Sequence, residues 1–101
     1  MSYAVTVTFD IHNSENADYD EINEALVSIG LYKNIKANNN KTISLPNNTY
    51  FGEFNNYQTN SAGDLRENIA NRIKKEFDKM KLKSNIFVAV GGDWAWGSSK
   101  T

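Results

Sequence analysis

The start of the chain alternates between apolar and small polar residues, a period-two pattern that is typical of a half-buried β-strand. The apolar positions are Tyr3, Val5, Val7, Phe9 and Ile11, and the positions between them are Ala4, Thr6, Thr8 and Asp10. Successive side chains of a strand point to opposite faces of a sheet. We therefore predict a strand whose apolar side faces the core and whose threonine-lined side is open to water or covered by a partner.

Two later segments repeat apolar residues at helical spacing. They carry Tyr19, Ile22, Ala25, Leu26 and Ile29 in the first segment, and Ala62, Leu65, Ile69, Ile73, Phe77 and Met80 in the second. Asp18 and Ser61 precede these segments, each with an acidic residue three positions later, which is the spacing of a helix N-cap. Gly30 supplies a C-terminal stop for the first segment. We predict two amphipathic helices, each with one face to bury.

A hairpin is predicted between the two helices. Residues 31–37 and 41–45 have the character of two short strands, and they flank the run Asn38-Asn39-Asn40. Asparagine tolerates the positive φ angle that tight turns require. Pro46 ends the second arm, because proline has no N–H group to donate to a sheet.

Two further strands complete the predicted fold. Residues 50–54 form one, in which Gly52 marks either a bulge or a close approach of two backbones. Residues 86–90 are apolar throughout, which is typical of a strand covered on both faces. With right-handed crossovers, the order of elements predicts a single α+β domain over residues 1–101. Its expected architecture is a ferredoxin-like split βαββαβ sandwich, with two helices on one face of a four-stranded antiparallel sheet and an extra hairpin arm near residues 31–45.

Composition narrows the classes of function. A chain of 101 residues with 40% hydrophobic residues can bury one core. It contains no cysteine, which excludes disulfides, thiolate catalysis and cysteine-ligated zinc. Neither a secretory leader nor an apolar run long enough to span a bilayer is recognisable, so we expect a cytoplasmic protein. The formal net charge of -1 argues against coating of nucleic acid through bulk positive charge.

The charges are nevertheless unevenly distributed along the chain. Acidic residues gather before and within the first helical segment, and basic residues gather in the second. Arg72, Lys75, Lys79 and Lys83 recur there at helical spacing, which would suit contacts with phosphate groups. The alternative is the ordinary solvated face of an amphipathic helix. Arg66 lies closer to the apolar stripe, where it reaches either an acidic ligand or water past the sheet edge.

Asp10 and His12, at the end of the first strand, are the candidate catalytic residues. The Asp10 carboxylate is also the candidate metal ligand, and a two-fold dimer would bring its copy alongside to hold Mg²⁺ or Mn²⁺ at a shared site. His12 is the single histidine and a candidate general base or metal ligand. The alternatives are that the Asp10 carboxylate only forms the turn, and that His12 is a solvent-exposed loop residue.

The remaining candidates are large aromatic residues outside the apolar faces of the first strand and the two helices. Trp94 and Trp96 share a parity near the C-terminus, and Tyr50, Phe51 and Tyr57 lie in or near the strand at 50–54. Aromatic rings stack on unpaired bases, and they also anchor protein interfaces or fill a core. We treat Trp94 and Trp96 as candidate interface residues.

Short motifs give the chain a resemblance to known families. The segment Val7-Thr8-Phe9-Asp10-Ile11 resembles the first strand of the small CRISPR-associated nucleases of the Cas-two type, and of the related VapD-like and GhoS-type endoribonucleases. Leu45-Pro46 and Tyr50-Phe51-Gly52 are similar to GhoS-type antitoxins, which cleave a toxin's messenger RNA. The resemblance implies ferredoxin-like homodimers in which Asp10 matches the metal-site aspartate.

Two hypotheses of function follow. The first is a homodimeric nucleic-acid-binding protein, extended by the resemblance to a metal-dependent endoribonuclease of the toxin–antitoxin type. In it Asp10 holds the metal, while Arg72, Lys75 and Lys79 hold the RNA backbone. The second is a non-enzymatic module, such as a small phage or mobile-element inhibitor, that binds a protein partner through Trp94 and Trp96.

Overall fold

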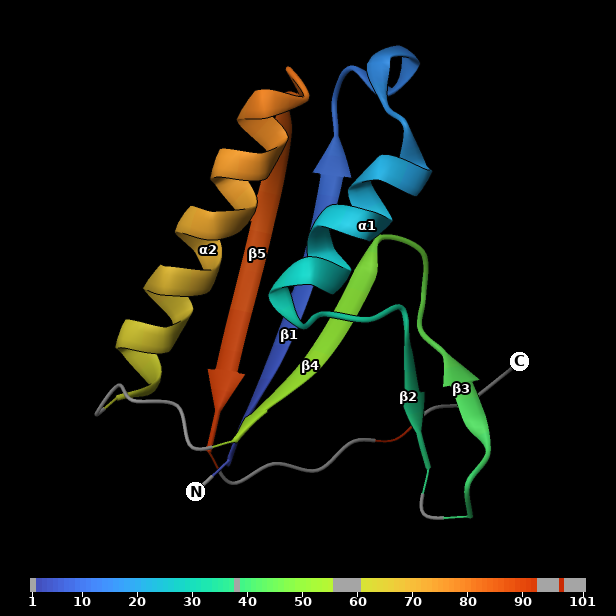
Figure 1. Ribbon diagram of the computed structural model, residues 1–101, viewed down its shortest axis with the longest axis vertical. Coiled ribbons are helices and arrows are strands. Elements are labelled where there is room, and N and C mark those ends of the chain that lie inside the picture. The colour runs from blue at the N-terminus through green and yellow to red at the C-terminus, as the bar shows by residue number, and fades with distance from the viewer. Residues whose placement is uncertain (1, 38, 56–60, 93–96, 98–101) are drawn as a thin grey trace.

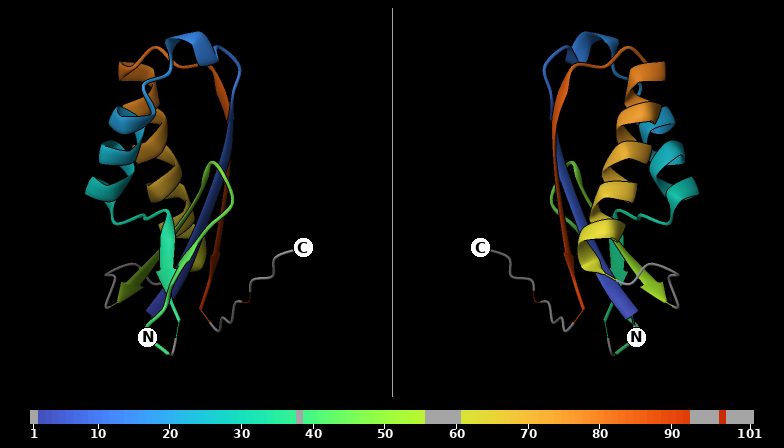
Figure 2. Two further views of the ribbon diagram at one scale, coloured as in Figure 1. Left: turned by 90° about the vertical axis from the view of Figure 1, so that its right-hand side faces the viewer. Right: turned by 90° about the vertical axis from the view of Figure 1, so that its left-hand side faces the viewer.

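The computed structural model describes residues 2–37, 39–55, 61–92 and 97 (Figure 1). Its elements in chain order are β1 (Ser2–Ile11), the 3-10 turn η1 (Ser14–Asn16), α1 (Tyr19–Ile29), β2 (Asn34–Lys36), β3 (Thr42–Ser44), β4 (Thr49–Asn55), α2 (Ala62–Lys79) and β5 (Ser84–Gly91). β1 lies between β4 and β5 in a three-stranded antiparallel sheet. The side views show α1 and α2 on the same face of this sheet (Figure 2). The predicted α+β class and one-sided helix layer are confirmed.

The alternation in β1 sets which face of the sheet is covered. Val5 and Val7 are fully buried and Phe9 is nearly so, whereas Thr8 and Asp10 are exposed. The apolar residues therefore face the helices, as the period-two pattern predicts. The opposite face, which we call the open face, carries the threonines and Asp10.

The core forms where both helices meet the centre of the sheet. The α1 residues Ile22, Leu26 and Ile29 and the α2 residues Leu65, Ile69, Ile73 and Phe77 are all buried. The ring of Phe9 lies 5.2 Å from that of Phe77 in an edge-to-face contact and 6.0 Å from that of Tyr50. None of the helices in the described ranges combines the length and the apolar character that crossing a bilayer requires.

Both helices begin at their predicted caps. The Asp18 carboxylate accepts hydrogen bonds from the N–H groups of Asp20 and Glu21, at 3.1 and 3.2 Å. The Ser61 hydroxyl accepts one from the N–H of Asp64, at 3.0 Å. Each bond pairs an N–H group that the first helical turn leaves without an intrahelical partner.

Gly52 marks a close approach of two backbones and not a bulge. The β1–β4 register runs without interruption through Val5 and Gly52. A Cβ atom on Gly52 would overlap the carbonyl oxygen of Gly30. Gly30 itself ends α1 with a φ of 105°, in the left-handed region that favours glycine.

The predicted four-stranded sheet is not confirmed, because most of the 31–45 segment pairs with itself. Tyr32 and Phe51 exchange two main-chain hydrogen bonds of 2.8 Å, and they form an isolated bridge beside β4. Directly afterwards the carbonyl of Lys33 accepts a hydrogen bond from the N–H of Leu45, at 2.9 Å. The chain therefore pairs within its own hairpin, and the strands expected at 31–37 and 41–45 shorten to β2 and β3, a separate two-stranded sheet. Asn40 takes a positive φ of 64° at the predicted turn.

The expectation that residues 86–90 are covered on both faces is wrong within one chain. β5 is an edge strand of the described sheet, paired with β1 alone. Phe87 points to the open face and is 63% exposed, and Ala89 is exposed on the same face. An apolar run does not distinguish a central strand from an edge strand that has an uncovered face.

Candidate nucleic-acid interface

The predicted cations lie on the outer side of α2. Because Leu65, Ile69, Ile73 and Phe77 turn one side of this helix into the core, the residues between them turn outward. Arg72, Lys75 and Lys79 are all exposed. At about 100° per residue, they fall within about 60° of one another around the helix axis, so they share one flank. The structure therefore places these three cations on one exposed flank, whereas Lys83, the fourth predicted member of the row, lies beyond the end of α2 at Lys79.

A shallow depression on α2 places a further cation, Lys74, near Lys75 and Lys79. It has a volume of about 580 Å³ and is lined by Asn71, Lys74, Lys75, Asp78 and Lys79. Lys74 was not among the predicted contact residues, and at about 100° per residue it lies roughly 160° around the helix axis from Arg72. We call Arg72, Lys75 and Lys79 the cationic face of α2, and Lys74 borders it across this depression.

Acidic residues reduce the charge of the cationic face without cancelling it. The Lys79 ammonium lies 3.5 Å from a Glu76 carboxylate oxygen, one turn away on the same helix. The Lys79 side chain is 62% exposed, so this ion pair is solvated and contributes little to stability. Asp78 lies in the same depression as Lys74 and Lys75. The face is suited to a small number of phosphate contacts and not to a dense array of them.

Arg66 does not belong to this face. It is exposed near the start of α2. Six residues separate it from Arg72, which places the two side chains about 120° apart around the helix axis. The structure brings Arg72, Lys75 and Lys79 together and leaves Arg66 to one side.

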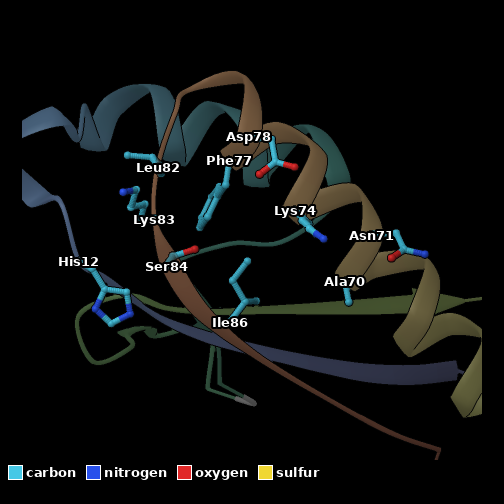
Figure 3. Close-up of a pocket in the computed structure, with 10 residues that line it drawn as sticks. All are labelled: His12, Ala70, Asn71, Lys74, Phe77, Asp78, Leu82, Lys83, Ser84 and Ile86. Atoms are coloured by element: carbon cyan, nitrogen blue, oxygen red, sulfur yellow. The ribbon is translucent and has the colours of Figure 1, made fainter.

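A second groove is lined by residues of α2 and of the start of β5. It has a volume of about 510 Å³, and its lining includes His12, Lys74, Asp78, Lys83 and Ile86 (Figure 3). The main-chain N–H of His12 donates a 2.7 Å hydrogen bond to the carbonyl of Lys83, which extends the β1–β5 pairing past Ile11. His12 is exposed at the end of this groove, and no hydrogen bond or ion pair of its side chain appears in the described part of the chain.

Asp10 is exposed on the open face, opposite Asn85 of β5. Among the described residues, no group of three or more histidine, cysteine or acidic side chains is close enough to hold a metal ion. One carboxylate supplies too few ligands for Mg²⁺ or Mn²⁺ without a second copy or a substrate. The predicted metal site, which two copies of Asp10 would share, stays a prediction.

The aromatic candidates separate into different environments. Tyr50 is 1% exposed and belongs to the core, where its hydroxyl donates a 3.3 Å hydrogen bond to Oδ1 of Asn23 on α1. Burial raises the pKa of Tyr50 to about 12. Phe51 lies on the open face opposite Thr6. Trp94, Trp96 and Tyr57 lie outside the described residues.

Phe87 is the exposed aromatic residue that the sequence reasoning missed. Its side chain is 63% exposed, more than the other exposed large hydrophobic residues of the described chain, which are Tyr19, Val27 and Tyr32. Its parity with Asn85 and Ala89 was visible in the sequence, but the uncovered face was not.

Comparisons of the chain with family models, curated proteins and solved structures found no match. The resemblance to small endoribonucleases therefore stays a prediction.

Proposed function

We propose that the protein is a cytoplasmic, homodimeric nucleic-acid-binding protein whose contact surface is the cationic face of α2. The observation that carries this proposal is the exposure of Arg72, Lys75 and Lys79 on one flank, with Lys74 near Lys75 and Lys79 in the adjoining depression. Lysine and arginine side chains bind phosphate oxygens and release counterions from the nucleic acid, which is the main source of sequence-independent affinity.

The same proposal includes a ferredoxin-like fold. Its support is the position of the Tyr32–Phe51 bridge, which lies on the side of β4 that faces away from β1. A fourth strand of a ferredoxin-like sheet would occupy this position. Tyr32 would then mark an edge strand that is reduced to one residue pair.

The test is a binding titration of fluorescent single-stranded RNA at several salt concentrations. Three phosphate contacts give a log–log salt slope of about −2 for a single strand. Combined substitution of Arg72, Lys75 and Lys79 by glutamine is expected to abolish most of this slope and to weaken binding at low salt. The matched control substitutes Lys33, Lys36 and Lys41 by glutamine, because these residues are also exposed and the change in net charge is the same.

Equal losses in the two triple variants would show that bulk charge and not the cationic face drives binding. Absence of RNA binding by the unmodified protein at low salt would contradict the proposal itself.

RNA cleavage is a separate prediction, because Asp10 has no companion ligands within the described chain. Its test compares RNA turnover with and without Mg²⁺ or Mn²⁺ in the unmodified protein and in Asp10→Asn. Asp20→Asn is a matched control, since Asp20 is also exposed. Loss of cleavage in Asp10→Asn alone, with RNA binding retained, would support a role for Asp10. Cleavage that persists in this variant would remove Asp10 from the reaction.

A protein-interaction module is the second candidate, and the exposure of Phe87 on the open face favours it. Such a module binds its partner through aromatic anchors and has no need of the cationic face. Partner binding that depends on Trp94 and Trp96, in a protein with no measurable affinity for RNA, would support this class.

A further inference from the structure

β5 presents a strand edge that no other described strand covers. The two edges of the sheet differ in this respect, because Tyr32 and the β2–β3 hairpin lie beside β4. Residues 84–91 read Ser-Asn-Ile-Phe-Val-Ala-Val-Gly, without a charged residue or a proline. Natural proteins normally protect long edge strands with such residues, since exposed main-chain groups otherwise pair with another strand.

The hydrogen bonding of β1 identifies which β5 residues face outward. The bond from the His12 N–H to the Lys83 carbonyl marks a hydrogen-bonded pair. In antiparallel strands such pairs alternate, so the odd-numbered residues of β5 bond to β1. The N–H and C=O groups of Ser84, Ile86, Val88 and Val90 therefore point away from the sheet.

The side chains along this edge are also incompletely covered. Ile86, Val88 and Val90 face the helix layer and contact the core, yet each is only partly buried. The groove of about 510 Å³ between α2 and β5 runs past Ile86 (Figure 3). A neighbouring strand would bring apolar side chains to this position.

We propose that a second copy of the chain pairs with this edge, β5 against β5 in antiparallel orientation, with the two-fold axis at Phe87. This register places Ile86 opposite the partner's Val88, and Ser84 opposite the partner's Val90. All four outward residues of each chain then pair, giving about eight main-chain hydrogen bonds, two for each of four pairs. Phe87 meets the partner's Phe87 on the open face, where the exposed aromatic rings contact one another.

The charges on α2 favour a second copy as the occupant. Ala70, Asn71 and Lys74 line the same groove as Ile86, so this part of α2 lies near the proposed axis. An antiparallel copy of α2 centred between Ala70 and Asn71 brings Glu67 to the partner's Lys74, and Lys74 to the partner's Glu67. Glu67, Asn71 and Lys74 are exposed. The small Ala70 side chain at the centre allows the two helices to approach. The surface is therefore complementary to itself, as a two-fold interface requires.

This arrangement specifies the homodimer of the proposed function but does not depend on nucleic-acid binding. It places both α2 helices on one side of a continuous sheet. It also separates the two Asp10 residues, because β5 and the partner's β5 lie between the two copies of β1. Three strand spacings of about 4.8 Å make this separation at least roughly 14 Å. One metal ion cannot bridge carboxylates so far apart, so this dimer has no shared Asp10 site.

Cysteine cross-linking in the full chain tests the register, since the sequence contains no cysteine. Phe87→Cys places two sulfurs across a non-hydrogen-bonded pair, where Cα atoms about 4.5 Å apart allow a disulfide. We expect most of this variant to become a covalent dimer on oxidation. Ala89→Cys is the matched control, because the register puts its two copies roughly 14 Å apart. A mixture of Asn85→Cys and Ala89→Cys chains is expected to form the mixed disulfide.

Measurements of solution mass, on the unmodified protein and on charge-reversal variants, complete the test. They are made without nucleic acid. Sedimentation is expected to give a dimer, with Glu67→Lys or Lys74→Glu weakening it about three- to tenfold. Combining the two substitutions is expected to restore the dimer, whereas a loss of folding would not be reversed in this way. A monomer at all concentrations would overturn the proposal. So would a dimer in which Ala89→Cys cross-links as readily as Phe87→Cys. Because no RNA is present, either failure leaves the RNA-binding proposal standing.

Discussion

The buried hydroxyl of Tyr50 makes the stability of the protein sensitive to alkaline pH. This side chain is 1% exposed, stacks on Phe9, and donates a hydrogen bond to Asn23. Burial raises the pKa of Tyr50 to about 12, against an ordinary value of 10.0. The cause is the cost of placing a phenolate among apolar side chains.

The direction of the effect follows from the proton balance between the two states. Below pH 10 the hydroxyl is protonated in both the folded and the unfolded chain, so pH has no effect through this group. Between pH 10 and 12 the unfolded chain releases the proton while the folded chain retains it. The free energy of unfolding therefore falls as pH rises, by up to about 1.4 kcal/mol for each pH unit. Over the whole window the loss is on the order of 2–3 kcal/mol.

The assay is urea unfolding, followed by circular dichroism from pH 8 to pH 12. Tyr50→Phe removes the titrating hydroxyl and keeps the ring, so the difference between the two proteins isolates Tyr50 from lysines and other tyrosines. We expect the variant to be about 1 kcal/mol less stable at pH 8, because it loses a hydrogen bond. Its disadvantage should shrink and then reverse towards pH 12. Tyr19→Phe is the matched control, since Tyr19 is 44% exposed. Parallel loss of stability in the unmodified protein and in Tyr50→Phe would refute the reasoning.

Further predictions concern packing and caps, and thermal or urea unfolding measures each of them. Gly52→Ala is expected to cost about 3 kcal/mol or more, because its Cβ atom would overlap the carbonyl oxygen of Gly30. Gly91→Ala should change stability by less than about 1 kcal/mol, since a Cβ atom there meets nothing within 4 Å; a similar cost for both would contradict the close-approach argument. Asp18→Ala removes both cap hydrogen bonds and should cost about 1 kcal/mol, and an unchanged midpoint would show that the cap is unimportant. Phe77→Ala should cost about 3–5 kcal/mol, and a loss below about 1 kcal/mol would exclude the core contact with Phe9.

The features that local sequence determines were predicted well. The parity of β1 follows from alternation over neighbouring residues, and the buried stripe of α2 from residues one turn apart. The caps at Asp18 and Ser61 depend on groups within three positions of one another. None of these predictions needs knowledge of a distant part of the chain.

The predictions that the structure does not confirm depend on which strand lies beside which. After Tyr32 the chain can either continue along β4 or pair with residues 41–45 in a hairpin. The outcome depends on competition between these two partners for the same main-chain groups. The Lys33 carbonyl pairs with Leu45, and this choice is not encoded in the β-propensity of residues 31–37. The grouping of Arg72, Lys75 and Lys79 on one flank of α2 was available from spacing alone. The uncovered face of Phe87 was not, because it depends on what the rest of the chain leaves open.

The composition of β5 suggests a physical reason why the sequence did not reveal the uncovered face of Phe87. A strand that stays at the edge of a monomer gains solubility from a charged residue or a proline, and it loses little by having one. β5 has neither, and it carries Phe87 and Ala89 where water would otherwise select polar residues. The sequence is therefore suited to a strand that is central in the assembled protein, although β5 is at the edge in a single chain. On this reasoning, the expectation of a doubly covered strand would hold only in the proposed dimer. Val88→Lys is therefore expected to lower the dimer fraction in sedimentation more than it lowers the unfolding midpoint of the monomer, because Val88 is only partly buried within one chain.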